Sequence, residues 1–362
     1  MTESAGIQVL GRGFAPSGYQ MIRTVEIENF RGIGKARITD AARINIMVGP
    51  NGTGKTAFLE AMFLAGGNSP ENLMKTRAFR GREGGEVQVD PRRLADFLLA
   101  DAFRDPALGR ASIKMMGDDG EDRSVEILNT EAATIMSPSG DQAVTEVGLT
   151  FNWEGPQGRA TSQPRLVAEG LRMDMVFAGP GVHFFPARVN ISERETASAF
   201  SRLSVEGREG DFVAAFLKEF PQLTDIGVEA PNGAPSLHAR LPSRRKLPLT
   251  MISGGISHLA GMLIRLAANP KSVLLIDEIE NGFYHDRYSS IWRTLYDMCV
   301  KNDCQIFATS HSLECLNALV DALPNHASDV RFLRSSLEDG EIAFEQLRGE
   351  TFFKAIKIGE VR

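Results

Sequence analysis

The sequence predicts an α/β fold, with a mainly parallel core sheet flanked by helices and an added antiparallel β layer. Three observations support this fold class. Strand-like and helix-like segments alternate after Pro221, several strand-like segments follow one another between residues 111 and 178, and a glycine-rich loop lies between a hydrophobic strand and an amphipathic helix at residues 43–66. Alternating strands and helices are typical of parallel sheets, whereas successive strands favour antiparallel pairing.

The composition is that of an ordinary globular protein, with 43% hydrophobic and 24% charged residues in a chain of 362. A formal net charge of −6 argues against a surface that binds nucleic acid indiscriminately, although it is compatible with a local basic groove. The three cysteines (Cys299, Cys304 and Cys315) form no C-x-x-C pair and fit reduced thiols in a cytoplasmic protein. No apolar run approaches the length of a membrane-spanning helix, so we expect no membrane partner.

The first half of the chain should supply the antiparallel layer and the start of the core sheet. Residues 1–20 lack the organisation of a signal peptide, and we expect them to form a flexible extension. In IRTVEIENF, the alternation places Val25 and Ile27 on one face of a strand, and RINIMV at 43–48 predicts a more buried strand. The other elements expected here are a helix from about Lys55 to Gly66, a helix capped by Asp90-Pro91, and the strand-like segments SIKMM, SVEIL, TEVGLTFNW and LRMDMVF.

The second half of the chain alternates between helices and strands. Ser192-x-x-Glu195 is typical of a capping box that opens a helix. The further elements expected are helices at about 211–220, 255–268, 286–300 and 312–322, strands at 272–277 and 304–309, and then two strands with a short terminal segment. No heptad pattern is sustained, so no long coiled coil is expected. We predict that lobe I spans residues 21–225 and lobe II spans residues 226–362.

Residues 49–56, GPNGTGKT, match G-x-x-x-x-G-K-[ST] at every fixed position and stand between a strand and a helix, as a phosphate-binding P-loop must. Its glycines let successive N–H groups turn inward, and the helix N-terminus adds a positive dipole. Lys55 would reach the β- and γ-phosphates, and the Thr56 hydroxyl would bind Mg²⁺. The candidate nucleotide-binding residues are therefore Gly49, Pro50, Asn51, Gly52, Thr53, Gly54, Lys55, Thr56 and Ala57.

The stretch VLLIDEIENGFYH, residues 273–285, carries acidic residues to the end of an aliphatic strand. A P-loop site needs a second strand that delivers one carboxylate to the magnesium ion and another to the attacking water. Asp277 is the expected metal ligand, and Glu278, one residue further on, is the expected general base. Glu280 fits a structural role as well as a catalytic one.

Three further features choose among the P-loop proteins. SGG at 253–255 opens a helix, and a serine at a helix N-terminus is another group that can bind phosphate. If the P-loop is complete, this serine is not needed for the nucleotide of its own chain. The strand QIFATS is followed by His311, which can reach a γ-phosphate from a strand beside the acidic one. The segment ENFRG, residues 28–32, follows the first strand.

Together these motifs resemble the ABC-type ATPase heads of the SMC/RecF/OLD branch of P-loop NTPases. There, NFRG, a P-loop of the form GPNGxGKT, a serine-glycine-glycine signature, an aliphatic DE strand, a D-loop and a switch histidine occur in this order. DEIENGFYHDRYSSIWRTL followed by QIFATSHSLECLNAL looks most like the OLD-type ATPases known as abortive-infection or phage-defence proteins. The resemblance covers residues 21–70 and 245–325.

The resemblance implies ATP and Mg²⁺ as ligands and a role for each matching residue. Lys55, Glu278 and His311 would be catalytic, Thr56 and Asp277 would bind Mg²⁺, and Arg31 would lie near the phosphates. The signature residues (Ser253, Gly254 and Gly255) would contact the ATP held by a second subunit, and Glu280-Asn281-Gly282 would form a D-loop at the dimer interface. The Q-loop glutamine has no assignable counterpart, and Pro186-Ala187-Arg188 is the candidate for its place.

These features predict an ATP-hydrolysing homodimer, or a higher homo-oligomer, in which nucleotides are sandwiched between subunits. In one hypothesis the ATPase is a sensor in phage defence and controls a separate effector such as a nuclease, because the stretch after Ala322 is too short for the TOPRIM domain of OLD relatives. In the other it is a RecF-like repair ATPase that binds DNA directly. A small-molecule kinase or GTPase is disfavoured, since N-K-x-D is missing and SGG would have no role.

Overall fold

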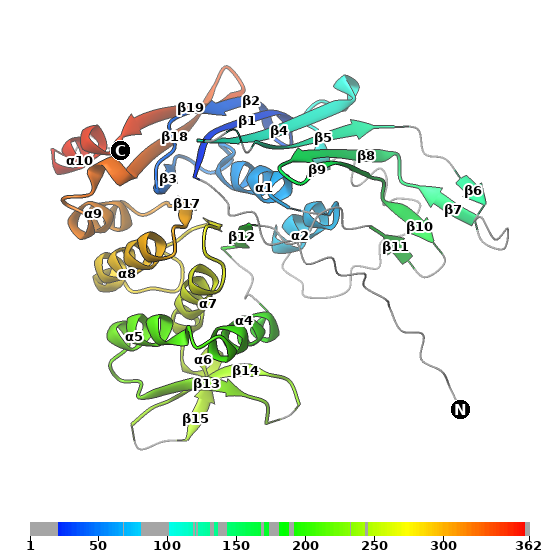
Figure 1. The fold of residues 1–362 in the computed structure, drawn as a ribbon. Coiled ribbons are helices and arrows are strands. Elements are labelled where there is room, and N and C mark those ends of the chain that lie inside the picture. Colours follow the sequence, from blue (N-terminus) through cyan, green and yellow to red (C-terminus); the bar gives the residue numbers. More distant parts are fainter. Residues whose placement is uncertain are drawn as a thin grey trace, which may run out of the picture.

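The computed structural model describes residues 21–67, 69–80, 101–118, 120, 122–130, 134–136, 143–167, 170–173, 181–187, 192–231, 233–242 and 245–358. Two six-stranded sheets form the body of the protein, and helix α1 (Lys55–Ala65) lies between them (Figure 1). A four-stranded and a three-stranded sheet extend from this body. No helix in the described part of the chain is long and apolar enough to cross a membrane, and the same residues contain no long coiled coil.

The antiparallel sheet confirms the predicted β layer. Its strands follow the order β2-β1-β4-β5-β8-β9, and each pair of neighbours is antiparallel. Val25 and Ile27 both point into the core, as their alternation predicted. The strand bounds are β1 (Ile22–Phe30), β2 (Ile33–Ile38), β4 (Arg110–Gly117), β5 (Arg123–Asn129), β8 (Leu149–Gly155) and β9 (Gly158–Ser162).

The central sheet is mainly parallel, as predicted. Its order is β12-β16-β17-β3-β18-β19, and only the edge pair β18–β19 is antiparallel. The strand bounds are β3 (Ile44–Val48), β12 (Val182–Phe185), β16 (Val273–Ile276), β17 (Gln305–Thr309), β18 (Val330–Glu338) and β19 (Glu341–Arg348). This sheet combines strands from both sides of residue 225, so the predicted lobes share one sheet; the division itself stays a prediction.

Two hydrophobic cores lie on opposite faces of the central sheet. Successive residues of β16 alternate between them: Val273 and Leu275 join the core around α1, and Leu274 and Ile276 join the core beneath the other helices. Because both faces are covered, the strand is aliphatic throughout rather than alternating with polar residues. The helices of the second core are α4 (Glu193–Val205), α5 (Glu209–Glu219), α7 (Gly254–Ala268), α8 (Tyr288–Lys301), α9 (Leu313–Ala322) and α10 (Gly349–Lys357).

The remaining elements are short. They are α2 (Glu71–Arg80) and α6 (Leu249–Ile252), the 3-10 turns η1 (Pro106–Leu108), η2 (His285–Arg287) and η3 (Ala327–Asp329), the four-stranded sheet of β6 (Thr134–Met136), β7 (Ala143–Glu146), β10 (Arg165–Val167) and β11 (Gly170–Arg172), and the three-stranded sheet of β13 (Asp225–Glu229), β14 (Ser236–Arg240) and β15 (Lys246–Pro248). The three-stranded sheet and α6 lie below α4 and α5 in Figure 1.

The local expectations agree with most elements and differ at a few. The Ser192 hydroxyl accepts a hydrogen bond from the Glu195 backbone amide at 3.3 Å, which confirms the N-cap of α4. Strand β2 was not predicted, and TEVGLTFNW divides into β7 and β8 at Gly148, whose φ of 77° breaks the strand. The helix expected after Asp90-Pro91 lies outside the described residues, as does most of LRMDMVF.

Candidate nucleotide-binding site

Four loops meet where the parallel strands of the central sheet end. The P-loop follows β3, Pro186 follows β12, Asp277 follows β16, and His311 lies two residues after the end of β17. Because β12, β16, β17 and β3 run in the same direction, their carboxyl ends lie along one edge of the sheet. Open α/β sheets bind ligands at this edge.

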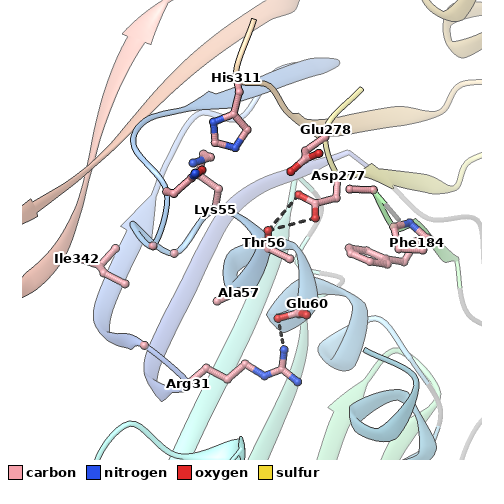
Figure 2. Close-up of a pocket in the computed structure, with 16 residues that line it drawn as sticks. Arg31, Lys55, Thr56, Ala57, Glu60, Phe184, Asp277, Glu278, His311 and Ile342 are labelled. Carbon is pink, nitrogen blue, oxygen red and sulfur yellow. Dashed lines mark hydrogen bonds and ion pairs between the residues drawn. The ribbon is translucent and has the colours of Figure 1, made fainter. Parts of the chain in front are cut away.

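The loops enclose a cavity of about 390 Å³. The P-loop residues Asn51, Gly52, Gly54, Lys55 and Thr56 line it, together with Asp277, Glu278 and His311. Figure 2 shows Lys55 and Thr56 beside Asp277, Glu278 and His311. Pro186 and Ala187 also line the cavity, at the place suggested for the Q-loop, whereas Arg188 lies outside the described residues. The structure therefore brings the P-loop together with the acidic pair and His311, which lie more than two hundred residues further along the chain.

The P-loop is held open by glycines and braced by β18. Gly49, Gly52 and Gly54 have φ angles of 144°, 81° and 82°, which L side chains rarely adopt. A Cβ atom on Gly49 would lie 2.2 Å from the Ser335 carbonyl oxygen of β18, so the loop requires glycine there. The Thr53 hydroxyl lies 2.6 Å from the Ser335 hydroxyl, which anchors the middle of the loop to the same strand.

Lys55 points into the loop that it closes. Its ammonium group donates hydrogen bonds to the carbonyl oxygens of Gly49 at 2.7 Å and Pro50 at 2.8 Å. Burial lowers the pKa of Lys55, and the carboxylates of Asp277, Glu278 and Glu280 oppose that shift. A buried cation beside the N-terminus of a helix is suited to binding a polyphosphate.

Thr56 and Asp277 form an oxygen site beside the P-loop. The Thr56 hydroxyl lies 3.1 Å from both carboxylate oxygens of Asp277, and the Thr309 hydroxyl donates to the same carboxylate at 2.7 Å. Burial raises the pKa of Asp277, whereas the hydrogen bonds from Thr309 and Thr56 favour its charged form. A carboxylate and a hydroxyl are hard oxygen ligands, so these residues fit Mg²⁺.

Glu278 lines the cavity beside Asp277, and its surroundings hold it from two sides. Its backbone has a φ of 52°, and its N–H donates to the Thr309 hydroxyl at 2.7 Å. The side-chain amide of Asn281 donates to its carboxylate at 2.7 Å. A carboxylate at the edge of the cavity is suitably placed to take a proton from water.

His311 is exposed at the mouth of the cavity, above Lys55 in Figure 2. Its backbone N–H donates to the Glu280 carboxylate at 2.6 Å, so the loop after β16 contacts the loop after β17. The other oxygen of Glu280 is buried and has no hydrogen-bond partner among the described residues. The geometry therefore gives Glu280 a structural contact, which was one of the two roles left open by the sequence.

Arg31 lines the cavity, but its guanidinium is bound to protein groups. It forms an ion pair with Glu60 of α1 and donates to Thr76 of α2 and to Asp101, both at 2.8 Å. Only 4% of its side chain is exposed. A phosphate contact by Arg31, expected from the resemblance, would have to compete with two carboxylates.

The signature segment lies apart from this cavity. Ser253 occupies the N-cap position of α7 without a capping hydrogen bond from its side chain. Neither Ser253 nor Gly254 and Gly255 is among the residues that line the cavity of their own chain. Instead, Gly255 packs on the D-loop: a Cβ atom there would lie 2.0 Å from the Gly282 carbonyl oxygen. The roles assigned to these residues and to the P-loop stay predictions.

Several lining or supporting residues were not assigned from the sequence. Thr309 joins the two acids, Glu60 lies one helical turn after Thr56, and Ile342 reaches the cavity from β19. The position of Thr309 at the end of the strand beside the acidic one could have indicated its role. Ile342 carries no such signal, because only the pairing of β18 with β3 brings its hairpin to the P-loop.

Two AAA-domain family models match parts of the chain. One, described as an AAA domain, matches residues 24–142. The other, described as "AAA domain, putative AbiEii toxin, Type IV TA system", matches residues 187–317. The first match contains the P-loop, and the second contains the signature segment, the acidic pair and His311.

The similar curated proteins include DNA replication and repair proteins RecF. The RecF protein of Yersinia pseudotuberculosis serotype O:1b is 33% identical over 138 residues, which are 37% of this chain and 35% of that protein. The RecF protein of Shewanella denitrificans is 28% identical over 151 residues, which are 38% of this chain and 36% of that protein. The match thus spans about a third of the length of these relatives.

Solved SMC head domains share the fold over nearly the whole chain. An SMC head bound to the C-winged helix domain of ScpA aligns with a TM-score of 0.56 and 14% identity, and covers 92% of this chain and 99% of that chain. An SMC head domain with an extended coiled coil, bound to the C-terminal domain of ScpA from Pyrococcus furiosus, aligns with a TM-score of 0.50 and 14% identity over 94% and 98% of the two chains. The protein has an SMC-head-like P-loop ATPase fold, and the comparisons together support an ABC-type ATPase of the SMC/RecF branch.

Proposed function

We propose that this protein binds and hydrolyses ATP between two copies of itself and uses the cycle as a conformational switch. The observation that carries the proposal is the division of the site. One chain gathers the P-loop, Asp277, Glu278 and His311 around a single cavity, whereas Ser253 lies outside that cavity. A signature serine that does not line the cavity of its own chain is available to the nucleotide of a second subunit.

In this proposal each residue of the cavity has a physical task. Lys55 and the backbone N–H groups of the P-loop bind the phosphates, and Thr56 with Asp277 holds Mg²⁺. The metal ion, when bound, neutralises charge on the phosphates. Glu278 takes a proton from the attacking water, and His311 contacts the γ-phosphate. Because ATP would touch both subunits, it binds the closed dimer more tightly than the open form, and its hydrolysis favours opening.

Two wider roles have support from different comparisons. The match of residues 187–317 to a model described with a putative AbiEii toxin favours a defence ATPase, which would act in the cytoplasm and control a separate effector such as a nuclease. The RecF matches favour a DNA-repair ATPase at least as well. Binding of duplex DNA with and without ATP, measured over a range of salt, separates them: specific ATP-dependent binding is expected only for the repair role.

The first test of the switch uses Glu278→Gln and Lys55→Ala. Glu278→Gln should still bind ATP but hydrolyse it slowly, so a dimer should accumulate in size-exclusion chromatography with Mg²⁺ and excess ATP. Lys55→Ala should lose nucleotide affinity and give no ATP-dependent dimer. A Glu278→Gln protein that binds ATP without dimerising would contradict the sandwich arrangement.

The second test asks whether Ser253 acts on the nucleotide of the other subunit. Lys55→Ala and Ser253→Arg should each hydrolyse ATP poorly alone. In a mixed dimer, the intact P-loop of the Ser253→Arg chain faces the intact serine of the Lys55→Ala chain, so mixing the two should restore activity. Absence of rescue, with both variants folded, would place Ser253 outside the composite site.

A further inference from the structure

The D-loop side chain of Asn281 bridges two walls of the nucleotide cavity. Its amide nitrogen donates to the Glu278 carboxylate at 2.7 Å and to the backbone carbonyl of Ala187 at 3.2 Å. Both acceptors belong to residues that line the cavity, whereas Asn281 does not line it. The Asn281 and Glu278 side chains are both half-buried, so this contact is only partly open to water.

Glu278 needs such a contact if its carboxylate is to stay in one place. Its backbone is held by the Thr309 hydroxyl, but several rotatable bonds separate that backbone from the carboxylate. Fixing a flexible side chain costs conformational entropy, which a hydrogen bond to a charged group can offset. A general base is effective only when its oxygen stays within reach of the water it deprotonates.

The neighbours of Asn281 make the loop around it rigid. Glu280 holds the His311 backbone, and Gly282 packs against Gly255 at the start of α7. The residue before Asn281 therefore contacts the loop after β17, and the residue after it contacts the start of α7. Its amide connects that segment to Glu278 and to the chain after β12.

We propose that Asn281 is a positioning residue that holds the Glu278 carboxylate at the cavity through its side-chain amide. This inference rests on the proposed function, in which Glu278 is the general base. It adds that the D-loop of a chain orients the base of the same chain. A shift of the D-loop on dimer closure would thus move Glu278 directly.

The test compares Asn281→Asp with Asn281→Ala in steady-state ATP hydrolysis. Asp has nearly the shape of Asn but no N–H donor, and it places a second carboxylate beside Glu278. Both variants should lower kcat about ten- to a hundredfold, the loss expected for one hydrogen bond to a charged group, with the aspartate at least as slow. The dissociation constant for ATP should change less than about threefold, because Asn281 does not line the cavity. If Asn281 only fills space, Asn281→Asp should retain wild-type kcat, and that result would overturn the proposal.

Thermal unfolding without nucleotide tests the contact itself. In the wild-type background, Asn281→Asp sets two carboxylates against each other and should lower the Tm. In the Glu278→Gln background, the amide introduced by that substitution can donate to the new aspartate, so Asn281→Asp should lower the Tm less. An equal decrease in both backgrounds would show that the two side chains do not interact, and would reject the inference even if a variant were inactive for other reasons.

A matched control is Asn152→Asp on the antiparallel sheet. Asn152 accepts a hydrogen bond from the Thr161 hydroxyl, which an aspartate also accepts, and it lies far from the nucleotide cavity in the chain and outside its lining, so kcat should stay at the wild-type value. The outcomes also separate this inference from the proposed function. A wild-type protein that hydrolyses no ATP contradicts the proposed function, whereas an active wild type with an equally active Asn281→Asp contradicts only the role of Asn281.

Discussion

At the scale of single residues, the hydroxyl of Thr309 joins the two acids at the end of the central strand. It donates to the Asp277 carboxylate at 2.7 Å and accepts the Glu278 backbone N–H at 2.7 Å. Thr309 is fully buried, so its hydroxyl makes these two hydrogen bonds away from water. One buried atom thus orients the candidate metal ligand and the backbone of the candidate base.

We expect Thr309→Val to be destabilising although it keeps the shape of the side chain. The substitution leaves the Asp277 carboxylate and the Glu278 N–H without this partner, which should cost about 1–3 kcal/mol. It should also raise the pKa of Asp277 further, because the lost hydrogen bond favoured its charged form. Urea unfolding without nucleotide measures the cost, and Thr309→Ser, which keeps the hydroxyl, should stay closer to wild type. Equal stabilities of the valine and serine variants would contradict this account.

Residues in the cavity differ in how far local sequence predicts them. The P-loop residues and Asp277 lie where their motifs place them, because both motifs occupy the ends of buried strands. The motif of Arg31 predicts its position by the cavity but does not predict its partners, which are Glu60, Thr76 and Asp101. These acceptors come from three separate segments, and no local pattern specifies that they meet.

At the scale of elements, the signature helix α7 and the D-loop form one packed unit. The backbones of Gly255 and Gly282 are so close that no side chain fits between them. The two glycines of the SGG motif therefore differ in their surroundings. Gly254 faces open space, whereas Gly255 permits the close approach. Packing of this kind couples the position of Ser253 to the position of Glu280 and Asn281.

Gly255→Ala tests this packing, and Gly254→Ala is its matched control in the same helical turn. The added methyl at 255 would lie 2.0 Å from a backbone oxygen, so either α7 or the D-loop must shift. We expect Gly255→Ala to lower the free energy of unfolding by about 1–3 kcal/mol. Gly254→Ala should be neutral or slightly stabilising, because alanine has the higher helix propensity.

The measurement is thermal or urea unfolding of the nucleotide-free protein. The contact between Gly255 and Gly282 lies within one chain, so the measurement does not depend on dimer formation. Gly255→Ala should also form less of the ATP-dependent dimer, while ATP still binds at the P-loop of each chain. A Gly255→Ala variant as stable as Gly254→Ala would show that α7 and the D-loop are not in the close contact described.

Errors in predicting elements also have physical reasons. Strand β2 contains IGKARI, in which small and charged residues alternate with apolar ones, and it was not recognised beside the strong pattern of β1. Its pairing with β1 through the turn at Arg31 supplies the stability that its own composition does not. Strand propensity depends strongly on such neighbours.

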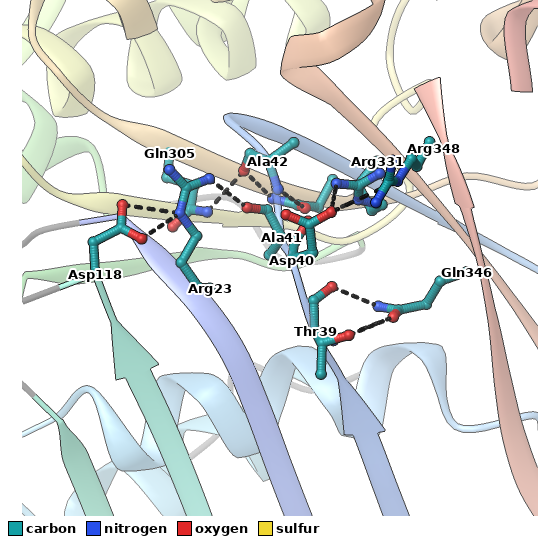
Figure 3. Close-up of polar contacts among 11 residues, drawn as sticks. Arg23, Thr39, Asp40, Ala41, Ala42, Asp118, Gln305, Arg331, Gln346 and Arg348 are labelled. Atoms are coloured by element: carbon teal, nitrogen blue, oxygen red, sulfur yellow. Dashed lines mark hydrogen bonds and ion pairs between the residues drawn. The ribbon is translucent and has the colours of Figure 1, made fainter. Parts of the chain in front are cut away.

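At the scale of the whole molecule, polar contacts fasten the N-terminal hairpin to strands from the end of the chain (Figure 3). The buried Gln305 amide accepts the Ile22 N–H at 2.9 Å and donates to the carbonyls of Ile22 and Ala42 at 2.9 and 2.7 Å. Arg331 donates to the Asp40 carboxylate at 2.6 Å. The Gln305 contacts span 283 residues of sequence, so they join the two large sheets only in the folded state.

Gln305→Ala should destabilise the whole body of the protein. It removes three hydrogen bonds and leaves buried backbone groups without partners, a loss of about 2–4 kcal/mol. Gln346→Ala, which breaks the exposed contact with Thr39, is the control and should change stability by less than about 0.5 kcal/mol. Urea unfolding followed by tryptophan fluorescence measures both.

The two tryptophans make the test sensitive to cooperativity. Trp153 lies in the antiparallel sheet and Trp292 in α8, and single-tryptophan variants follow each region separately. Because the two sheets share α1 and the Gln305 contacts, Gln305→Ala should move both unfolding midpoints by a similar amount. A shift of only one midpoint would mean that the two sheets unfold independently.

The sequence by itself determined the fold class, the P-loop, the acidic pair and the order of most strands and helices. These features are local: each depends on hydrophobic periodicity, glycine conformations or a short motif within one strand–loop–helix segment. The comparisons support the ATPase branch implied by those motifs, and the SMC-head fold agrees with it.

Only the tertiary structure decided which side chains meet around the cavity. Thr309 forms hydrogen bonds with both acids, and Arg31 forms an ion pair with Glu60. Asn281 donates a hydrogen bond to Glu278, and Ser253 does not line the cavity of its own chain. Such contacts depend on the register and packing of strands and helices that are far apart in the chain. Local periodicity shows that a segment is a strand or a helix, but the partner it packs against is chosen by the burial and hydrogen bonding of the whole molecule.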